Sequence, residues 1–400
     1  MSNDYAHIEE LEVILFNAYR AARKGKRKHT DEYEFEMNLY ENIERLAIAI
    51  LDRSYRLTGG ISFVNFKPVI REIIAAEFKD RVVQHAAFSG VYGWWDTRLH
   101  PNSCSCRIGK GTDYAIDKVY SMMQSVSQNW QKEAYICKFD FKGYFMSINR
   151  EKLRQSVING LNRQFKDDHS WWPRTLKFLW ETIIMDDPIK HVRKRGRLSD
   201  FNLVPYDKSL YHQAPGVGLP IGNVTSQMGS NIMLDPFDRF VAYELGYKHY
   251  VRYVDDWVVI CTPEEKERLL QYDLPRIELF ARSLGLTLHP NKRYIQEVKH
   301  GVHFLGAIIY PHHILPDYRL INNFRTTAQQ FQMGCADQVQ LQSYLGRNQR
   351  FAGANIERQI FHECGWDYPF GEDKLERAAR RLPKAEKQDN PDFLTQGTLW

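Results

Sequence analysis

The alternation of apolar and polar positions divides the chain into helical segments and short, strongly apolar strands. The sequence pattern predicts one helix at each of 31 to 53, 113 to 130 and 262 to 283, and helical structure at 4 to 20, 151 to 185 and 320 to 364. Compact runs rich in β-branched and aromatic residues predict strands at 134 to 139 and on both sides of Asp255. The chain is therefore expected to combine many helices with a small, buried sheet.

The run from Tyr250 to Ile260 places two adjacent aspartates, Asp255 and Asp256, between two apolar segments. This pattern is typical of a β-hairpin with the carboxylates at its turn. Neighbouring carboxylates repel each other and are not easily buried without a cation, which indicates a divalent-metal site. An ordinary turn is the other interpretation, because Asp favours turns for its own reasons. A third carboxylate favours the metal site: Asp140 follows the predicted strand at 134 to 139 and could bridge two ions together with Asp255.

Composition limits the class of protein. The 400 residues are enough for two or three domains, and 43% hydrophobic with 26% charged residues is typical of a soluble globular protein. The net charge of +5 is a modest excess. No apolar run is long enough to span a membrane, and no signal peptide is seen. The six cysteines form no Cys-x-x-Cys pair, which disfavours zinc and favours the reducing cytoplasm.

Three motifs occur in an order and at spacings that resemble motifs A, B and C of reverse transcriptases. They are Asp140 with Phe145, then Gly218-Leu219-Pro220-Ile221-Gly222, then Tyr253-Val254-Asp255-Asp256. The segment at 284 to 292 resembles motif D, and the segment at 301 to 306 resembles motif E, a hairpin that grips the primer end. The resemblance implies an α+β right-hand polymerase with fingers, a palm built on an antiparallel sheet, and a short helical thumb.

The resemblance also divides the chain into parts. These are an N-terminal helical extension at 1–60, fingers at 61–133, a palm at 134–310 with a basic insertion at about 186–217, a thumb at 311–364 and a polar tail at 365–400. Two basic stretches, 23 to 29 and 190 to 197, could neutralise phosphates of a nucleic acid. For both of them a solvated or disordered connecting segment is an equally good interpretation.

The resemblance assigns the chemistry to a few side chains. Asp140 and Asp255 are expected to be the principal ligands of two Mg²⁺ ions, and Asp256 a weaker ligand or a supporting group. Phe141 would offer its backbone carbonyl to a metal. Lys292 has the position suspected of protonating pyrophosphate. A lysine that neutralises phosphate, or one that is merely exposed, is the alternative.

The expected substrates are dNTPs, template RNA and a DNA or RNA primer. Lys67 and Arg71 would face the triphosphate, and Phe145 would exclude a ribose 2′-hydroxyl, although Phe145 could simply be a core residue. The remaining dNTP-binding predictions are Ile221, Gly222 and Gln227. The predicted nucleic-acid contacts are Arg81, which could instead pair with Asp80, Arg107 and Lys110 in a glycine-containing loop, and Tyr253.

Motif B indicates which group of reverse transcriptases the chain resembles. Ile221-Gly222-Asn223, followed by Ser226-Gln227, resembles the signature of reverse transcriptases from diversity-generating retroelements, whereas many others carry Gln in place of Ile221. The resemblance implies synthesis that is error-prone at template adenines, a template-repeat RNA as substrate, and a small, basic, oligomeric helical-bundle protein as partner. An aliphatic side chain cannot hydrogen-bond and so holds a sugar and base less strictly than an amide would. Alternatively, Ile221 only fills space.

Three other functions stay open at this point. The chain could be a group II intron or retron type of reverse transcriptase with ordinary fidelity, a phage-defence polymerase of the same fold, or an RNA-binding scaffold with an inactive palm. Motif B disfavours the first, and the intact carboxylates disfavour the last. We find no RNase H, endonuclease or zinc-finger pattern, so nicking and template removal are expected to depend on other proteins.

Overall fold

The computed structural model describes residues 2–24, 30–66, 69–336, 338–348, 350–351 and 353–366. The predicted triphosphate contact Lys67, most of the first basic stretch and nearly all of the predicted tail lie outside these residues. Among the described residues, no helix combines the length and the apolar character that crossing a membrane requires.

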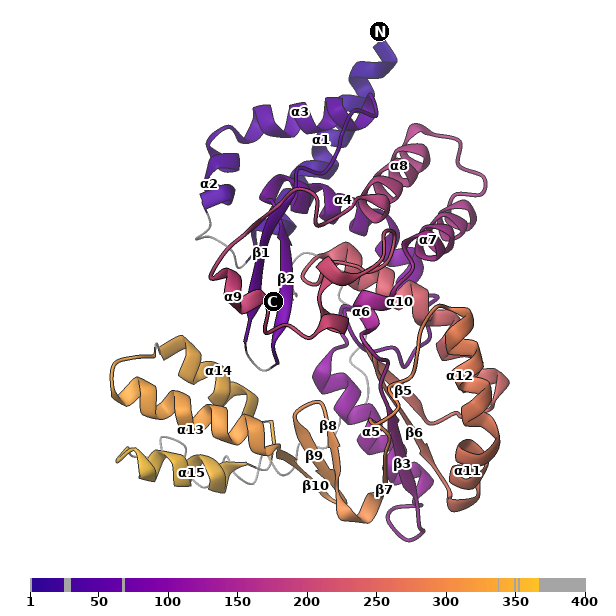
Figure 1. The fold of residues 1–400 in the computed structure, drawn as a ribbon, viewed down its shortest axis with the longest axis vertical. Coiled ribbons are helices and arrows are strands. Elements are labelled where there is room, and N and C mark those ends of the chain that lie inside the picture. Colours follow the sequence, from indigo (N-terminus) through magenta and orange to yellow (C-terminus); the bar gives the residue numbers. More distant parts are fainter. Residues whose placement is uncertain are drawn as a thin grey trace.

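Helices make up most of the described structure (Figure 1). They are α1 (Ser2–Arg23), α2 (Thr30–Met37), α3 (Leu39–Leu51), α4 (Phe78–Asp96), α5 (Thr112–Val126), α6 (Tyr144–Ser147), α7 (Arg150–Gln164), α8 (Trp171–Met185), α9 (Leu198–Phe201), α10 (Val224–Arg239), α11 (Pro263–Arg268), α12 (Leu274–Ser283), α13 (Tyr318–Gln332), α14 (Gln338–Asn348) and α15 (Ala354–Glu363). The strands are β1 (Gly60–Asn65), β2 (Arg71–Ala76), β3 (Tyr135–Phe139), β4 (Val192–Lys194), β5 (Tyr250–Tyr253), β6 (Asp256–Cys261), β7 (Tyr294–Glu297), β8 (Val302–Phe304), β9 (Ala307–Tyr310) and β10 (His313–Pro316).

The largest sheet of the described residues, here called the central sheet, has four antiparallel strands in the order β5-β6-β3-β7. Its register pairs Phe139 with Trp257 and Tyr253 with Asp256. The residue that follows β3 and the β5–β6 turn therefore lie at the same edge of the sheet. Two smaller sheets, β2-β1-β4 and β10-β9-β8, flank the central one.

Both faces of the central sheet are buried, which explains why β5 and β6 read as nearly continuous apolar runs. Trp257 and Val259 face the main core, which includes α4, α7, α8 and α10, whereas Val258 and Ile260 face a second core with α5 and β8–β9. Successive side chains of a strand point to opposite faces, so a strand covered on both sides is apolar at most of its positions. The prediction of strands on both sides of Asp255 is confirmed.

Helices α13 to α15 pack against one another around their own cluster, with Phe324, Leu341 and Ile360 at its centre. Figure 1 shows them set to one side of the central sheet, next to β8–β10. Arg350, after α14, joins this unit to α5 through ion pairs of 2.8 Å with Asp113 and 2.7 Å with Asp117.

The predicted helical segments are more divided than the hydrophobic pattern indicated. Segment 31 to 53 forms α2 and α3, segment 151 to 185 forms α7 and α8, and segment 320 to 364 forms three helices. The segment at 186–217 contains β4 and α9, and the cations of its basic stretch at 190 to 197 are exposed. Their contact with RNA stays a prediction. Strand β4 pairs in parallel with β1, and the buried Glu72 carboxylate on β2 accepts bonds from Ser209 Oγ and Leu210 N at 2.8 and 3.1 Å. A buried carboxylate needs such donors, so it anchors the insertion.

The contact between α4 and α7 gives a test of the packing. A Cβ added at Gly160 of α7 would lie 2.2 Å from Trp95 Cζ2 of α4, whereas at Gly93 of α4 it would meet nothing within 4 Å. We expect Gly160→Ala to lower the free energy of unfolding by about 1–3 kcal/mol through overpacking. The matched control Gly93→Ala should raise it by about 0.5–1 kcal/mol, since Ala is the better helix former. Urea unfolding measures both, and equal effects of the two variants would contradict this packing.

Candidate active site

Three carboxylates gather at one edge of the central sheet. Asp140 follows β3 directly and is only 6% exposed, Asp255 lies in the β5–β6 turn, and Asp256 begins β6. The antiparallel pairing of β3 with β6 brings these residues together although more than a hundred positions separate them in the chain. The sequence prediction that Asp140 and Asp255 lie on neighbouring segments is confirmed.

The carboxylates strongly affect one another. Burial raises the pKa of Asp255 well above its usual range, and the charges of Asp140 and Asp256 add to the shift. Burial also raises the pKa of Asp256, to which Asp140 contributes, while Lys138 acts in the opposite direction. The Oδ1 atom of Asp140 is buried, and with all carboxylates ionised no described group donates to it. Such a cluster favours a cation.

Two lysines already supply positive charge. Lys292 donates a hydrogen bond to Asp140 Oδ2, and Lys138 Nζ lies 3.3 Å from Asp256 Oδ2. Burial alone would lower the pKa of Lys292, but its bond to Asp140 and the surrounding carboxylates raise it. The segment before Lys292 is fixed to the end of β3, because His289 N donates to Asp140 O at 2.7 Å and Lys142 N donates to Thr287 O at 2.8 Å.

The described residues contain no group of three or more His, Cys, Asp or Glu side chains that could hold a metal ion by itself. The donors that are present still fit a hard divalent cation of the magnesium type, which takes one or two carboxylates and completes its shell with water and substrate phosphates. The buried, unpartnered Oδ1 of Asp140 is the atom on which this fit depends. Phe141, predicted to contribute its carbonyl, packs its buried ring against Tyr144 and Phe237.

The predicted nucleotide-binding residues Phe145 and Ile221 come together in space. Phe145, on α6, accepts a 2.8 Å hydrogen bond at its carbonyl from Leu219 N. Both side chains are half-buried and pack against the cluster formed by Ile74, Met146 and Leu210. The loop between Leu219 and α10 therefore lies directly against the segment that follows Asp140.

Three other predicted nucleotide-binding residues lie at the rim of this region. Gly222 has φ +116°, a conformation that L side chains rarely adopt, and it faces Ile73 of β2. Gln227 is half-buried in the first turn of α10, and Arg71 is exposed at the start of β2. No described contact joins Arg71 to the carboxylates, so its role in holding a triphosphate stays a prediction.

One predicted nucleic-acid contact, Arg107, is turned inward. It is 6% exposed, and its guanidinium donates to the Asp96 carboxylate and to the carbonyls of His100, Ser103 and Asp96. Arg107 therefore stabilises its own loop, because a buried cation must find acceptors within the protein. Lys110 is half-buried, and its Nζ donates to Pro101 O at 2.7 Å on an exposed part of the loop. Its contact with a nucleic acid stays a prediction.

Arg81 and Tyr253 are also engaged within the protein. Arg81 Nε donates to Ala76 O at 2.7 Å, and the partner proposed for it from the sequence, Asp80, instead accepts from Tyr55 and Thr58. The pairing of Arg81 with Asp80 is therefore wrong; besides the backbone bond, Arg81 Nη2 lies 3.9 Å from Asp31 Oδ2. Tyr253 is half-buried, with its hydroxyl 3.1 Å from Thr112 Oγ1.

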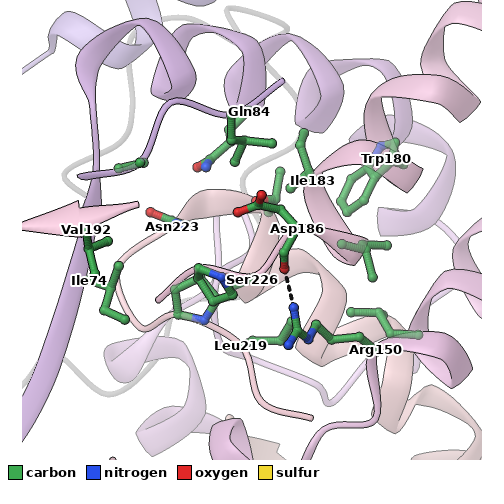
Figure 2. A pocket seen from close by; sticks show the side chains of 18 residues that line it. Ile74, Gln84, Arg150, Trp180, Ile183, Asp186, Val192, Leu219, Asn223 and Ser226 are labelled. Atoms are coloured by element: carbon green, nitrogen blue, oxygen red, sulfur yellow. Dashed lines mark hydrogen bonds between the residues drawn. The ribbon is translucent and has the colours of Figure 1, made fainter. Parts of the chain in front are cut away.

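A pocket lies behind the loop that carries Leu219 (Figure 2). Its walls come from β2, β4, α4, α7, α8 and the start of α10, and Figure 2 shows Gln84, Asp186 and Asn223 around its interior. Arg150 closes one side through a hydrogen bond to the carbonyl of Asp186. Neither Asp140 nor Asp255 lines the pocket. We place the chemistry at the carboxylates of Asp140, Asp255 and Asp256, because three negative charges converge there.

Sequence reasoning missed the residues that support the β5–β6 turn. Arg252 is completely buried and forms an ion pair with Asp238 of α10, and Ser103 and Ser105 lie beside them. Two signals could have found them. A lone arginine interrupts the apolar run before Tyr253, and aspartates interrupt the buried face of α10. A charge within a buried pattern requires a partner.

Comparison with known proteins gives one strong and several weak similarities. A family profile described as reverse transcriptase (RNA-dependent DNA polymerase) matches residues 70–309, more than half of the chain. Protein YkfC of Escherichia coli (strain K12) is 24% identical over 271 residues, which cover 59% of this chain and 62% of that protein. The chain thus spans less than two thirds of this curated relative.

Two solved structures with weak similarity are telomerases. Apo telomerase from Candida tropicalis has a TM-score of 0.45 at 10% identity, covering 81% of this chain and 61% of that one. Telomerase from Candida albicans in complex with a fragment of telomeric RNA has a TM-score of 0.44 at 12% identity, covering 87% and 61%. These values are too low to support conclusions about this chain.

The raised pKa of Asp255 predicts how stability depends on pH. A carboxyl whose pKa is higher in the folded state than in the unfolded state favours folding at low pH, and this contribution is lost as the pH rises through the folded pKa. In EDTA at pH 8 we therefore expect Asp255→Asn to raise the melting temperature by about 2–5 °C. The gain should disappear towards pH 4, where the wild-type carboxyl is protonated.

The exposed Asp167→Asn is the control for this experiment, because it makes the same change in net charge far from the cluster. It should leave the melting temperature within about 1 °C, as surface substitutions usually do. If Asp255→Asn were instead less stable than the wild type at pH 8, the repulsion inferred for the cluster would be absent.

Proposed function

The chain belongs to the reverse transcriptase (RNA-dependent DNA polymerase) family, and from this we propose that it is an RNA-directed DNA polymerase whose reaction centre is the cluster of Asp140, Asp255 and Asp256. The observation that carries the proposal is the pair of neighbouring carboxylates, one of them with a buried, unpartnered oxygen. An inactive scaffold would have no use for such repulsion, which lowers the stability of the protein.

The proposed reaction is attack of a primer 3′-hydroxyl on the α-phosphate of a dNTP. Asp140 and Asp255 would hold two Mg²⁺ ions, which when bound lower the pKa of the attacking hydroxyl and stabilise the leaving pyrophosphate. Asp256 is the weaker ligand in this assignment, since Lys138 already neutralises part of its charge. Lys292 would deliver a proton to pyrophosphate, a role supported by its position against Asp140.

The remaining elements take the roles of a right hand in this proposal. The β1–β2 hairpin, α4 and α5 correspond to the fingers, the central sheet with α10 to the palm, and α13 to α15 to the thumb. Arg71 would face the triphosphate, and Phe145 would exclude ribonucleotides. The position of Phe145 beside the motif B loop supports this assignment, since the same loop carries Ile221.

We further propose that the enzyme is of the diversity-generating type, which copies a template-repeat RNA into cDNA with errors at adenines. The support is the motif that begins at Ile221, together with the packing of Ile221 against the same cluster as Phe145. An aliphatic side chain there offers no hydrogen bond to the base or sugar, which reduces discrimination. A small, basic, oligomeric helical-bundle protein is the proposed partner by the same resemblance.

Primer extension on an RNA template, with Mg²⁺, four dNTPs and sequencing of the products, tests both levels of the proposal. Any RNA-templated DNA product supports polymerase activity, and errors concentrated at template adenines support the diversity-generating type. Faithful cDNA would contradict only the proposal that the enzyme is of the diversity-generating type. If no product forms, even with a structured RNA and a candidate accessory protein, the proposed polymerase activity would be contradicted.

The carboxylate assignment is tested with Asp140→Asn. The variant keeps the shape of the side chain but removes a charge that the reaction needs, so we expect the extension rate to fall about 10³-fold, equivalent to about 4 kcal/mol. Binding of primer–template, measured by fluorescence anisotropy, should change little. Asp167→Asn is the matched control and should keep the wild-type rate. Synthesis by Asp140→Asn at the wild-type rate would remove this residue from the reaction.

The fidelity assignment is tested with Ile221→Gln. An amide can hydrogen-bond where an aliphatic chain cannot, so errors opposite template adenine should fall about tenfold. Ile189→Gln is the control, because Ile189 packs against the same cluster but lies outside motif B. It should leave the error spectrum unchanged. An identical error rate in Ile221→Gln and the wild type would show that Ile221 only fills space.

A further inference from the structure

The turn that carries Asp255 has an unfavourable backbone. Tyr253 pairs with Asp256, so Val254 and Asp255 form a two-residue hairpin loop. Val254 has φ +58°. Loops of this kind favour Gly or Asn at positions of positive φ, and a β-branched residue there is a clear outlier. The loop sequence does not stabilise this conformation by itself, so other groups must hold it.

Two hydrogen bonds hold the backbone of Val254 from both sides. Arg252 Nη1 donates to Val254 O at 2.9 Å, and Val254 N donates to Ser105 Oγ at 3.0 Å. Ser105 belongs to the segment before α5 and is 1% exposed. The conformation of the turn therefore depends on one side chain of β5 and one from a distant part of the chain.

Hydrogen bonds on all sides of its guanidinium hold Arg252 in place. It is completely buried, and its Nε and Nη2 donate to the two carboxylate oxygens of Asp238 at 2.7 Å each. Nη1 also donates to Asn231 Oδ1 at 3.1 Å, and Nη2 to Ser103 Oγ at 2.9 Å. With Val254 O, these contacts use all five N–H donors of the guanidinium. A side chain bonded in this way cannot shift without breaking several bonds in the interior.

The segment that carries the serines is attached to the same strand. Arg252 N donates to Asn102 O, and Cys104 N donates to Arg252 O, both at 2.9 Å. Asn231 and Asp238 lie on α10, the helix that follows motif B. The turn is thereby connected to the segment before α5 and to α10, whose first residue follows the loop that carries Ile221.

We propose that Arg252 and Ser105 are positioning residues, which hold Val254 in its strained conformation and so fix the carboxylate of Asp255 against Asp140. This inference rests on the proposed function only in assigning that carboxylate to a metal. The competing role is purely structural, with the buried Arg252–Asp238 pair contributing to folding alone. A buried ion pair is weak evidence for stability, so the two roles must be separated by experiment.

Two substitutions in the 400-residue chain separate the positioning role of Arg252 and Ser105 from a purely structural role. Ser105→Ala removes the acceptor of Val254 N. Arg252→Lys keeps a positive charge beside Asp238, but a single ammonium cannot reach Asp238, Asn231 and Val254 O together. Ser230→Ala is the control, since this buried hydroxyl of α10 donates only to Gln227 O and does not contact the turn. If Arg252→Lys fails to fold, Ser105→Ala still distinguishes a positioning role from a structural one.

The first readout is Mn²⁺ binding to the protein alone, followed by electron paramagnetic resonance. We expect the dissociation constant to rise about tenfold in Ser105→Ala and Arg252→Lys, as is usual when the support of a metal ligand is lost, and to stay unchanged in Ser230→Ala. The second readout is primer extension, in which kcat should fall about tenfold while KM for dNTP stays within about twofold. Thermal unfolding is recorded for each variant.

A rescue experiment addresses the strain directly. Glycine adopts positive φ without penalty, so adding Val254→Gly to Ser105→Ala should restore most of the lost Mn²⁺ affinity. If both single variants keep wild-type Mn²⁺ affinity and lose only thermal stability, the role is structural and the proposal is overturned. If the wild type binds Mn²⁺ but makes no DNA, the proposed function fails while the binding measurements still decide the role of Arg252 and Ser105.

Discussion

Repulsion between like charges in a desolvated place is the constraint around which this protein is built. Asp140, Asp255 and Asp256 meet at the edge of a sheet that is covered on both faces; Asp140 is buried and the other two are half-buried, so water screens their charges only in part. The raised pKa of Asp255 expresses the energetic cost of this arrangement. A chain selected for stability alone would not keep these charges together, so the arrangement indicates a reaction that needs them.

The surrounding elements act against this repulsion in two ways: some neutralise charge, and others fix the backbone. Lys292 and Lys138 supply positive charge from the segment after α12 and from β3. Arg252 and Ser105 instead fix the backbone of the turn, so that the carboxylate of Asp255 cannot relax away from Asp140. The anchor for this fixation is the buried pair of Arg252 with Asp238 on α10. The helix that follows motif B and the turn that carries motif C thus form one rigid unit.

The sequence allowed the central features to be predicted because they depend on local pattern. Apolar runs identified β3, β5 and β6, and the aspartates at their ends identified the cluster. The directions of single cations could not be predicted. Arg107 was expected to be a phosphate contact, but tertiary packing turned it inward. Arg252 looked like an ordinary strand residue, because its partners Asp238 and Ser103 are distant in sequence and meet it only in the folded chain.

The most direct test of the central claim is anomalous scattering from Mn²⁺ in crystals of the protein with primer–template and an incoming dNTP analogue. The proposed chemistry predicts anomalous peaks in contact with the carboxylates of Asp140 and Asp255, one of them on the Oδ1 atom that is otherwise without a donor. Bound primer and nucleotide with no peak at these two aspartates, or with Mn²⁺ held elsewhere, would contradict the assignment of the reaction to this cluster.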